Sequence, residues 1–122
     1  MDKLDIFIAG VGGQGSLSAS TFLGHAAANA DLKVAVGEIH GMAQRGGIVT
    51  STVRIGSDVH GPIISRGAAD VVLGFEPVET WRALQMMSAR TLVIVNTRPI
   101  VPANVSMAGD DYPEAAAVVA EI

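Results

Sequence analysis

The feature that most constrains the fold is a glycine-rich segment, GVGGQG at residues 10–15, which lies between an apolar run and a helix-compatible stretch. Residues 4–9 (LDIFIA) carry β-branched and aromatic side chains and predict a buried strand. Residues 14–30 are compatible with a helix, and residues 33–37 (KVAVG) predict a second strand. Strand, glycine loop, helix and strand in this order are typical of the β-α-β unit of α/β proteins.

The middle of the chain predicts further strands and a second helix. Residues 48–55 (IVTSTVRI) alternate between two faces, and residues 70–75 (DVVLGF) form a short apolar run, so each predicts a strand. Residues 77–88 begin with Pro77, which suits the first turn of a helix, and repeat apolar side chains at helical spacing. These elements extend the same α/β pattern.

The last third of the chain gives one strong signal and two weak ones. Residues 91–95 (TLVIV) are the most continuous apolar run and predict a central strand covered on both faces. Residues 105–107 predict a short strand, and residues 113–122 predict the opening of an alanine-rich helix. We therefore predict a three-layer α/β/α Rossmann-like domain with a mainly parallel sheet. Because an α/β domain rarely ends within its last helix, we expect one domain over residues 1–122 whose C-terminal part is missing.

Composition narrows the function classes. A formal net charge of -4, with eight scattered Lys and Arg residues, argues against a nucleic-acid partner. The chain has no cysteine, which excludes disulfides, a cysteine nucleophile and a cysteine-ligated iron-sulfur cluster within it, and its three histidines are not at metal-ligand spacing. The N-terminus is acidic and no apolar run reaches the roughly 18 residues of a membrane span. We expect a cytoplasmic protein without a membrane or metal site.

The glycine loop predicts a phosphate site. Gly10, Gly12 and Gly15 match G-x-G-x-x-G between a strand and a helix, where glycines let the backbone approach a ligand and the helix start favours an anion. Gly13 and Gln14 lie between them and are candidate contacts as well. The alternative is that the glycines serve only a tight turn and close helix packing.

A second segment, EIHGMAQRGG at residues 38–47, follows the second strand. Glu38 lies where the ribose-binding acid of a dinucleotide fold would lie, which by itself favours NAD or FAD. Arg45 can hold a phosphate or carboxylate, His40 and Gln44 can offer hydrogen bonds, and Gly46 lets the chain come close. A solvated loop with an ordinary salt bridge is the alternative.

Other polar residues at strand ends are secondary candidates. Glu76 and Glu79 suit a helix start electrostatically and equally suit the rim of an active site. Asn96 and Arg98 follow the strand at residues 91–95, on the edge of the sheet where ligands collect.

Several motifs together resemble a known family. GVGGQG and EIHGMAQRGG are followed by STVRIG at residues 51–56, GAADVVLGFEPVE at residues 67–79 and VNTRPIVP at residues 95–102. In this order and spacing they resemble the gamma-type domain of the 2-oxoacid:ferredoxin oxidoreductases. HGMAQRGG followed by GFEPVE is similar to the beta-type subunits of the indolepyruvate branch. The subunits of that family are longer than this chain.

The resemblance implies a subunit, inactive alone, of an enzyme that oxidatively decarboxylates indolepyruvate and related arylpyruvates. Coenzyme A would accept the acyl group, giving an aryl-acetyl-CoA, CO2 and reduced ferredoxin. Thiamine diphosphate and the [4Fe-4S] clusters would belong to the large (alpha) subunit, and ferredoxin would bind the complex.

The resemblance also suggests roles for the two segments. It places coenzyme A near the glycine loop, with a phosphate received by Gly12, Gly13, Gln14 and Gly15. Arg45 and His40 would complete the anion site or face the large subunit. No residue is assigned as a catalytic acid or base. An NAD(P)-binding oxidoreductase and a non-catalytic assembly domain stay open as alternatives.

Overall fold

A five-stranded sheet forms the centre of the protein in a computed structural model, which describes residues 2–40, 47–101 and 112–122. The strands are β1 (Leu4–Val11), β2 (Val34–His40), β3 (Ile48–Ile55), β4 (Val71–Gly74) and β5 (Leu92–Val95), in the spatial order β2-β3-β1-β4-β5. β3 is antiparallel to both of its neighbours, whereas β1, β4 and β5 are mutually parallel. Since β2 is also antiparallel to β3, four strands run in one direction, which confirms the mainly parallel sheet.

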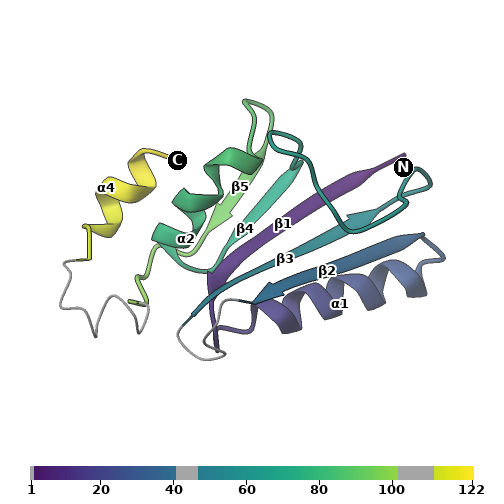
Figure 1. Cartoon of the computed structure of the whole chain (residues 1–122), viewed down its shortest axis with the longest axis horizontal. Coiled ribbons are helices and arrows are strands. Elements are labelled where there is room, and N and C mark those ends of the chain that lie inside the picture. Colours follow the sequence, from purple (N-terminus) through teal and green to yellow (C-terminus); the bar gives the residue numbers. More distant parts are fainter. Residues whose placement is uncertain (1, 41–46, 102–111) are drawn as a thin grey trace.

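Helices cover both faces of the sheet (Figure 1). α1 (Ser16–Asn29) packs on one face, where Ala27 joins an apolar cluster built from β1 and β3. α2 (Pro77–Arg82) and the 3-10 helix η1 (Ala83–Met86) lie on the other face, where Ala83 joins a second cluster. α4 (Ala115–Ala120) packs beside α2, and Trp81 Nε1 donates a hydrogen bond to Glu121 Oε2 at 2.8 Å. The predicted three-layer architecture is confirmed.

α1 packs closely because the residues that face the sheet are small. Its buried residues are Ser16, Ser20, Gly24 and Ala27. A Cβ on Gly24 would lie 2.9 Å from Val36 Cγ2, so β2 approaches the helix at this point more closely than any larger residue would allow. Ala26 and Ala30 of the same helix are exposed. Where α1 lies closest to the sheet, its buried residues are mostly serine and glycine rather than alanine.

The prediction that residues 91–95 form a central strand covered on both faces is wrong. β5 is the edge strand next to β4, and Leu92 and Ile94 on one of its faces are 59% and 56% exposed. Only the opposite face is covered, where Val93 packs against the second cluster. The central strand is β1, with Ile6 and Ile8 buried on the α1 side. A continuous apolar run indicates a strand, but it does not indicate how many strands will pair with it.

Other boundaries also differ from the predicted ones: the strand expected over residues 33–37 extends to His40. The helix expected over residues 77–88 ends at Met86, after a turn of 3-10 helix. The short strand expected at residues 105–107 lies outside the described residues. Within the described part of the chain, no helix has the length and apolar character needed to cross a membrane.

A buried ion pair ties the connection after β3 to the sheet. The Asp5 carboxylate is 1% exposed and accepts a hydrogen bond from Arg54 Nε at 2.8 Å, with Lys3 Nζ 3.0 Å away. Arg54 also donates through Nη1 to Gly61 O at 3.0 Å and to Ile63 O at 2.8 Å. One guanidinium therefore neutralises a buried acid and fixes the loop that follows β3.

Candidate functional site

Those predicted site residues that the structure describes gather at one edge of the sheet. The carboxyl ends of the four parallel strands lie there together with the start of β3 (Figure 1). Gly10 of β1 pairs with Val49 of β3, and Val49 pairs in turn with His40 of β2. Both glycine-rich segments therefore meet at the edge where open α/β sheets bind ligands.

The glycine loop has a backbone conformation that glycine adopts most readily. Gly13 has φ +93° and Gly15, the N-cap of α1, has φ +88°. A Cβ at either position would meet no atom within 4 Å, so the loop is open on its outer side. No side chain caps this helix start, and its first turn has no acidic residue.

A cavity of about 300 Å³ lies against this loop. Its lining residues are Gly12, Gly13, Gly15, Ser16, Leu17, Ser18 and Val49. Backbone N–H groups at a helix start carry partial positive charge and have no partner within the helix, which suits a phosphate. The hydroxyl groups of Ser16 and Ser18 are additional donors at this cavity that were not predicted from the sequence. Ser16 directly follows the last glycine of the motif, and this position could have indicated it.

Gln14 and Gly10 join the loop to the neighbouring strands. Gln14 Oε1 accepts from the N–H of Val11 at 2.8 Å, and its Nε2 donates to Phe75 O at 2.7 Å. Asn96 Nδ2 donates to the same Phe75 carbonyl at 3.0 Å. A Cβ on Gly10 would lie 3.1 Å from Phe75 Cβ, a tight contact that would require a small shift of the neighbouring side chain. These two residues do not line the loop cavity, and phosphate contact by Gln14 stays a prediction.

The second glycine-rich segment is attached to the first. Gly12 N donates to Gly47 O at 2.8 Å, directly before β3 begins. Gln44, Arg45 and Gly46 lie outside the described residues, and their proposed contacts stay predictions. His40 is the last residue of β2. The two segments therefore form one edge structure, as far as the described residues extend.

The position of Glu38 argues against a dinucleotide site. β3 lies between β2 and β1, so Glu38 is two strands, or roughly 10 Å, from the strand that leads into the glycine loop. In a dinucleotide fold the acid follows the strand beside the first one and reaches the ribose. Here Glu38 Oε1 instead accepts a hydrogen bond from Ser20 Oγ of α1 at 3.4 Å.

Glu76 forms a buried polar centre that the sequence left undecided between a helix cap and an active-site rim. Its side chain is fully buried at the start of α2, where Oε2 accepts from the N–H of Glu79 at 2.9 Å and Oε1 meets the Tyr112 hydroxyl. Burial raises the pKa of Glu76, against the effect of hydrogen bonds from the N–H groups of Glu79, Ile100 and Val78. The structure shows a capping role, while the pairing with Tyr112 had no local signal.

The neighbouring Glu79 is also buried. Burial raises its pKa, the Arg82 guanidinium at 3.2 Å opposes this effect, and the nearby Glu76 adds to it. Among the described residues, no group of three or more His, Cys, Asp or Glu side chains is arranged to hold a metal ion.

Comparison with known proteins identifies close sequence relatives. The chain is 50% identical over 113 residues to indolepyruvate oxidoreductase subunit IorB of Thermococcus kodakarensis, covering 93% of this chain and 56% of that protein. It is 46% identical over 120 residues to the subunit of the same name from Archaeoglobus fulgidus, covering 98% of this chain and 59% of the relative. The chain thus spans a little over half the length of the curated relatives it matches.

Solved structures share the fold. Subunit PORC of pyruvate oxidoreductase from Thermotoga maritima superposes with a TM-score of 0.67 at 24% identity, over 90% of this chain and 58% of that one. The 2-oxoglutarate:ferredoxin oxidoreductase of Magnetococcus marinus gives a TM-score of 0.68 at 22% identity, over 93% of this chain and 18% of that one. Residues 5–121 match the profile described as "Pyruvate ferredoxin/flavodoxin oxidoreductase". On this evidence the chain belongs to the pyruvate ferredoxin/flavodoxin oxidoreductase family.

Proposed function

We propose that this chain is part of the small subunit of a 2-oxoacid:ferredoxin oxidoreductase of the indolepyruvate type. The observation that carries the proposal is its 50% identity to IorB over 93% of its own length. The enzyme would oxidatively decarboxylate indolepyruvate and related arylpyruvates with coenzyme A, forming an aryl-acetyl-CoA, CO2 and reduced ferredoxin. We propose the cytoplasm as its location.

The glycine loop is our proposed site for a phosphate of coenzyme A. Gly13 and Gly15 hold the backbone in a conformation that leaves its outer side open, and the uncapped start of α1 supplies N–H donors beside a cavity of about 300 Å³. A solved relative by fold, the Magnetococcus marinus enzyme, has coenzyme A bound. We propose that the loop binds and orients coenzyme A, and we assign no residue as a catalytic acid or base.

The redox cofactors are proposed to lie in the large subunit. These 122 residues contain no cysteine, so the ligands of a cysteine-bound iron-sulfur cluster would lie outside them. Thiamine diphosphate would supply the decarboxylation chemistry when bound there. The proposed partners are this large subunit, ferredoxin through the complex, and the small-molecule substrates.

The test is coupled activity of the assembled complex. The chain is co-expressed with a large subunit of the indolepyruvate type, and methyl viologen reduction is followed with indolepyruvate and coenzyme A. Gly13→Asn is the informative variant, since asparagine tolerates positive φ and its side chain enters the open space above the loop. We expect the KM for coenzyme A to rise at least tenfold while the KM for indolepyruvate changes less than twofold.

Gly67→Asn is the matched control. Gly67 also has positive φ, at +71°, and the first atom a Cβ would approach is Met87 O at 3.8 Å, but it precedes β4 and so lies at the opposite edge of the sheet. An unchanged KM for coenzyme A in assembled Gly13→Asn complex would reject the phosphate site. A complex that turns over pyruvate but no arylpyruvate would reject the substrate class, and failure of assembly by Gly13→Asn alone would favour a loop used only for subunit contact.

A further inference from the structure

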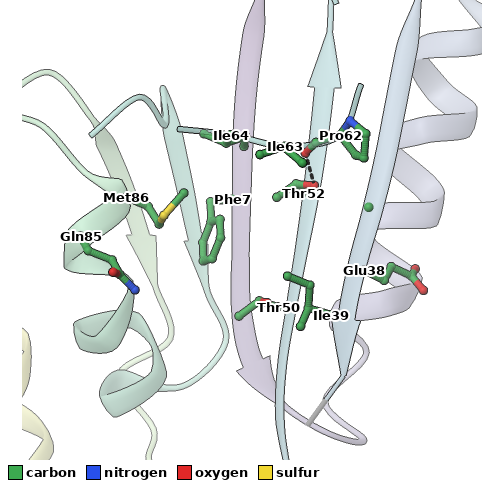
Figure 2. A pocket seen from close by; sticks show the side chains of 11 residues that line it. Phe7, Glu38, Ile39, Thr50, Thr52, Pro62, Ile63, Ile64, Gln85 and Met86 are labelled. Atoms are coloured by element: carbon green, nitrogen blue, oxygen red, sulfur yellow. Dashed lines mark hydrogen bonds between the residues drawn. The ribbon is translucent and has the colours of Figure 1, made fainter. Parts of the chain in front are cut away.

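A second cavity, of about 430 Å³, lies on the face of the sheet opposite α1 (Figure 2). Its floor is the side chains of β1, β2 and β3 that point away from α1, and its walls are the loop after β3 and the helix η1. The residues that line it are Phe7, Gly37, Glu38, Ile39, Thr50, Thr52, Pro62, Ile63, Ile64, Gln85 and Met86. This volume is within the range of small-molecule pockets.

One wall of this cavity is fixed by side chains of the sheet. Three consecutive carbonyls of the loop each have a donor on β3: Arg54 Nη1 binds Gly61 O and Ile63 O, and Thr52 Oγ1 binds Pro62 O at 2.7 Å. Arg54 is in turn held by the buried Asp5, as described above. The wall is therefore formed before any ligand arrives, which lowers the entropic cost of binding.

The wall also stands as close to β2 as the backbone allows. A Cβ on Gly37 would lie 2.7 Å from Pro62 Cβ and 2.9 Å from Thr52 Oγ1. Glycine at this position thus permits the loop to close one side of the cavity.

Large apolar side chains at the mouth are exposed. Ile39 of β2 is 71% exposed and Ile63 of the wall is 81% exposed, while Phe7 and Met86 are partly buried deeper in the cavity (Figure 2). Covering these surfaces would remove apolar area from water, at about 25 cal/mol per Å². The favourable free energy available here is hydrophobic.

The polar lining groups restrict the charge of a ligand. Glu38 is the one ionisable residue among the described lining residues, and its carboxylate points toward α1 on the other face of the sheet, where it accepts from Ser20 Oγ (Figure 2). No Lys or Arg of the described residues lines the cavity. The Thr52 hydroxyl is engaged by the wall, which leaves Thr50 and Gln85 as neutral hydrogen-bonding groups. Among these described residues a carboxylate or phosphate would lose its hydration without gaining a cation.

We propose that this cavity is a binding site for an uncharged apolar group of one or two rings, separate from the phosphate site at the glycine loop. The two sites use opposite faces of β3, because Val49 lines the loop cavity and the adjacent Thr50 lines this one. The proposal stands on the cavity itself and does not depend on the proposed function.

The test uses 5-fluoroindole, an uncharged two-ring probe, followed by 19F NMR with the full chain and with the assembled complex. We expect saturable binding in both, and at least tenfold weaker binding of the anion 5-fluoroindole-3-acetate. Ile39→Asp should weaken 5-fluoroindole binding at least tenfold, since it puts a charge at the mouth; the exposed position lets the variant fold. Phe22→Asp is the matched control, because Phe22 is 75% exposed on α1, on the other side of the sheet, and should bind the probe like the wild type.

Thr50→Trp is a second variant, which fills the cavity from its floor, and it should likewise weaken binding of 5-fluoroindole at least tenfold. Binding of 5-fluoroindole that survives both Ile39→Asp and Thr50→Trp would place the probe elsewhere and overturn the proposal. Equal affinity for the anionic probe would overturn the argument from charge. Binding that disappears when the large subunit assembles would identify the cavity as a subunit contact rather than a ligand site.

Discussion

The buried pair of Asp5 and Arg54 allows a quantitative test of what holds the loop after β3. Arg54→Met keeps much of the side-chain volume but removes the cation from a carboxylate that is 1% exposed. It also removes the donors for Gly61 O and Ile63 O. Two costs therefore add: an uncompensated buried charge and two carbonyls without their partners.

The magnitude follows from the environment of each group. Removing one partner of a buried pair costs about 3 to 5 kcal/mol, and Lys3 at 3.0 Å from Asp5 places this pair at the lower end, about 3 kcal/mol. The two carbonyls are at least partly exposed and can be rehydrated, so they add about 1 kcal/mol together. Arg54→Met should therefore lose about 4 kcal/mol, a large part of the roughly 5 to 15 kcal/mol of a typical domain.

Asp5→Asn should be milder, at about 2 kcal/mol, because the partly exposed Arg54 can be hydrated and keeps its carbonyl partners. In the double variant no buried charge is left without its partner, so its cost should be about 4 kcal/mol instead of about 6. A double-mutant cycle of these variants should therefore give a coupling free energy of about 2 kcal/mol between the Asp5 and Arg54 side chains.

The assay is equilibrium urea unfolding at pH 7, followed by circular dichroism and by the fluorescence of the single tryptophan, Trp81. For a slope of about 2 kcal/mol per molar urea, Arg54→Met shifts the midpoint by about 2 M. Arg90→Met removes an exposed arginine and should stay within about 0.5 kcal/mol of the wild type. Additive single variants, or an Arg54→Met cost below 1 kcal/mol, would refute this account of the pair.

Substitutions at Gly15, Gly74 and Glu76 test other features by the same unfolding assay. Gly15→Ala should lower the free energy of unfolding by about 1 to 2 kcal/mol because of the positive φ alone, since its Cβ would meet no atom within 4 Å. Gly15→Asn should lower it less, and equal losses for the two variants would contradict this explanation. Gly74→Ala should cost about 3 kcal/mol, because its Cβ would overlap Thr80 Oγ1, and adding Thr80→Ala should recover part of that loss. The pKa of Glu76 is raised in the native state, so this carboxyl group contributes its full stabilisation below pH 4.5, its pKa in the unfolded chain. That stabilisation is lost as the pH rises from 4.5 through the native pKa. The free energy of unfolding of Glu76→Gln relative to wild type should therefore increase over this pH range and then level off. A difference that stays flat with pH would contradict the burial of an ionisable carboxyl group.

Local patterns predicted the elements of this fold well. The alternation in residues 48–55 separates a buried face from a partly exposed one, as the burial of β3 confirms. The glycine loop, α1 and the first two strands lie where the spacing of apolar residues and glycines indicated. These features depend on interactions between residues close in sequence, for which periodicity is a direct signal.

Strand neighbours and long-range side-chain contacts were not predictable in the same way. The edge position of β5 depends on which strands pair with it, and its apolar composition carries no such information. Gln14 was predicted from the sequence as a ligand contact because it lies in the glycine loop, yet its amide group bonds the backbone of Phe75, 61 residues away. Pairings over such distances leave no local pattern, and Glu76 with Tyr112 is another example.

The insertion of β3 decides what the glycine fingerprint means in this chain. Gly10, Gly12 and Gly15 satisfy the same spacing as a dinucleotide loop and lie between a strand and a helix, so the local conditions of that motif are met. This chain differs from a dinucleotide fold in the strand beside β1. The antiparallel β3 begins next to the loop, where Gly12 N donates to Gly47 O, and it separates β2, which carries Glu38, from β1. The anion-binding half of the motif depends only on the loop and the helix start, whereas the ribose-binding half depends on the strand order. A site that keeps the first and lacks the second suits the phosphate-bearing ligand that we propose better than a dinucleotide.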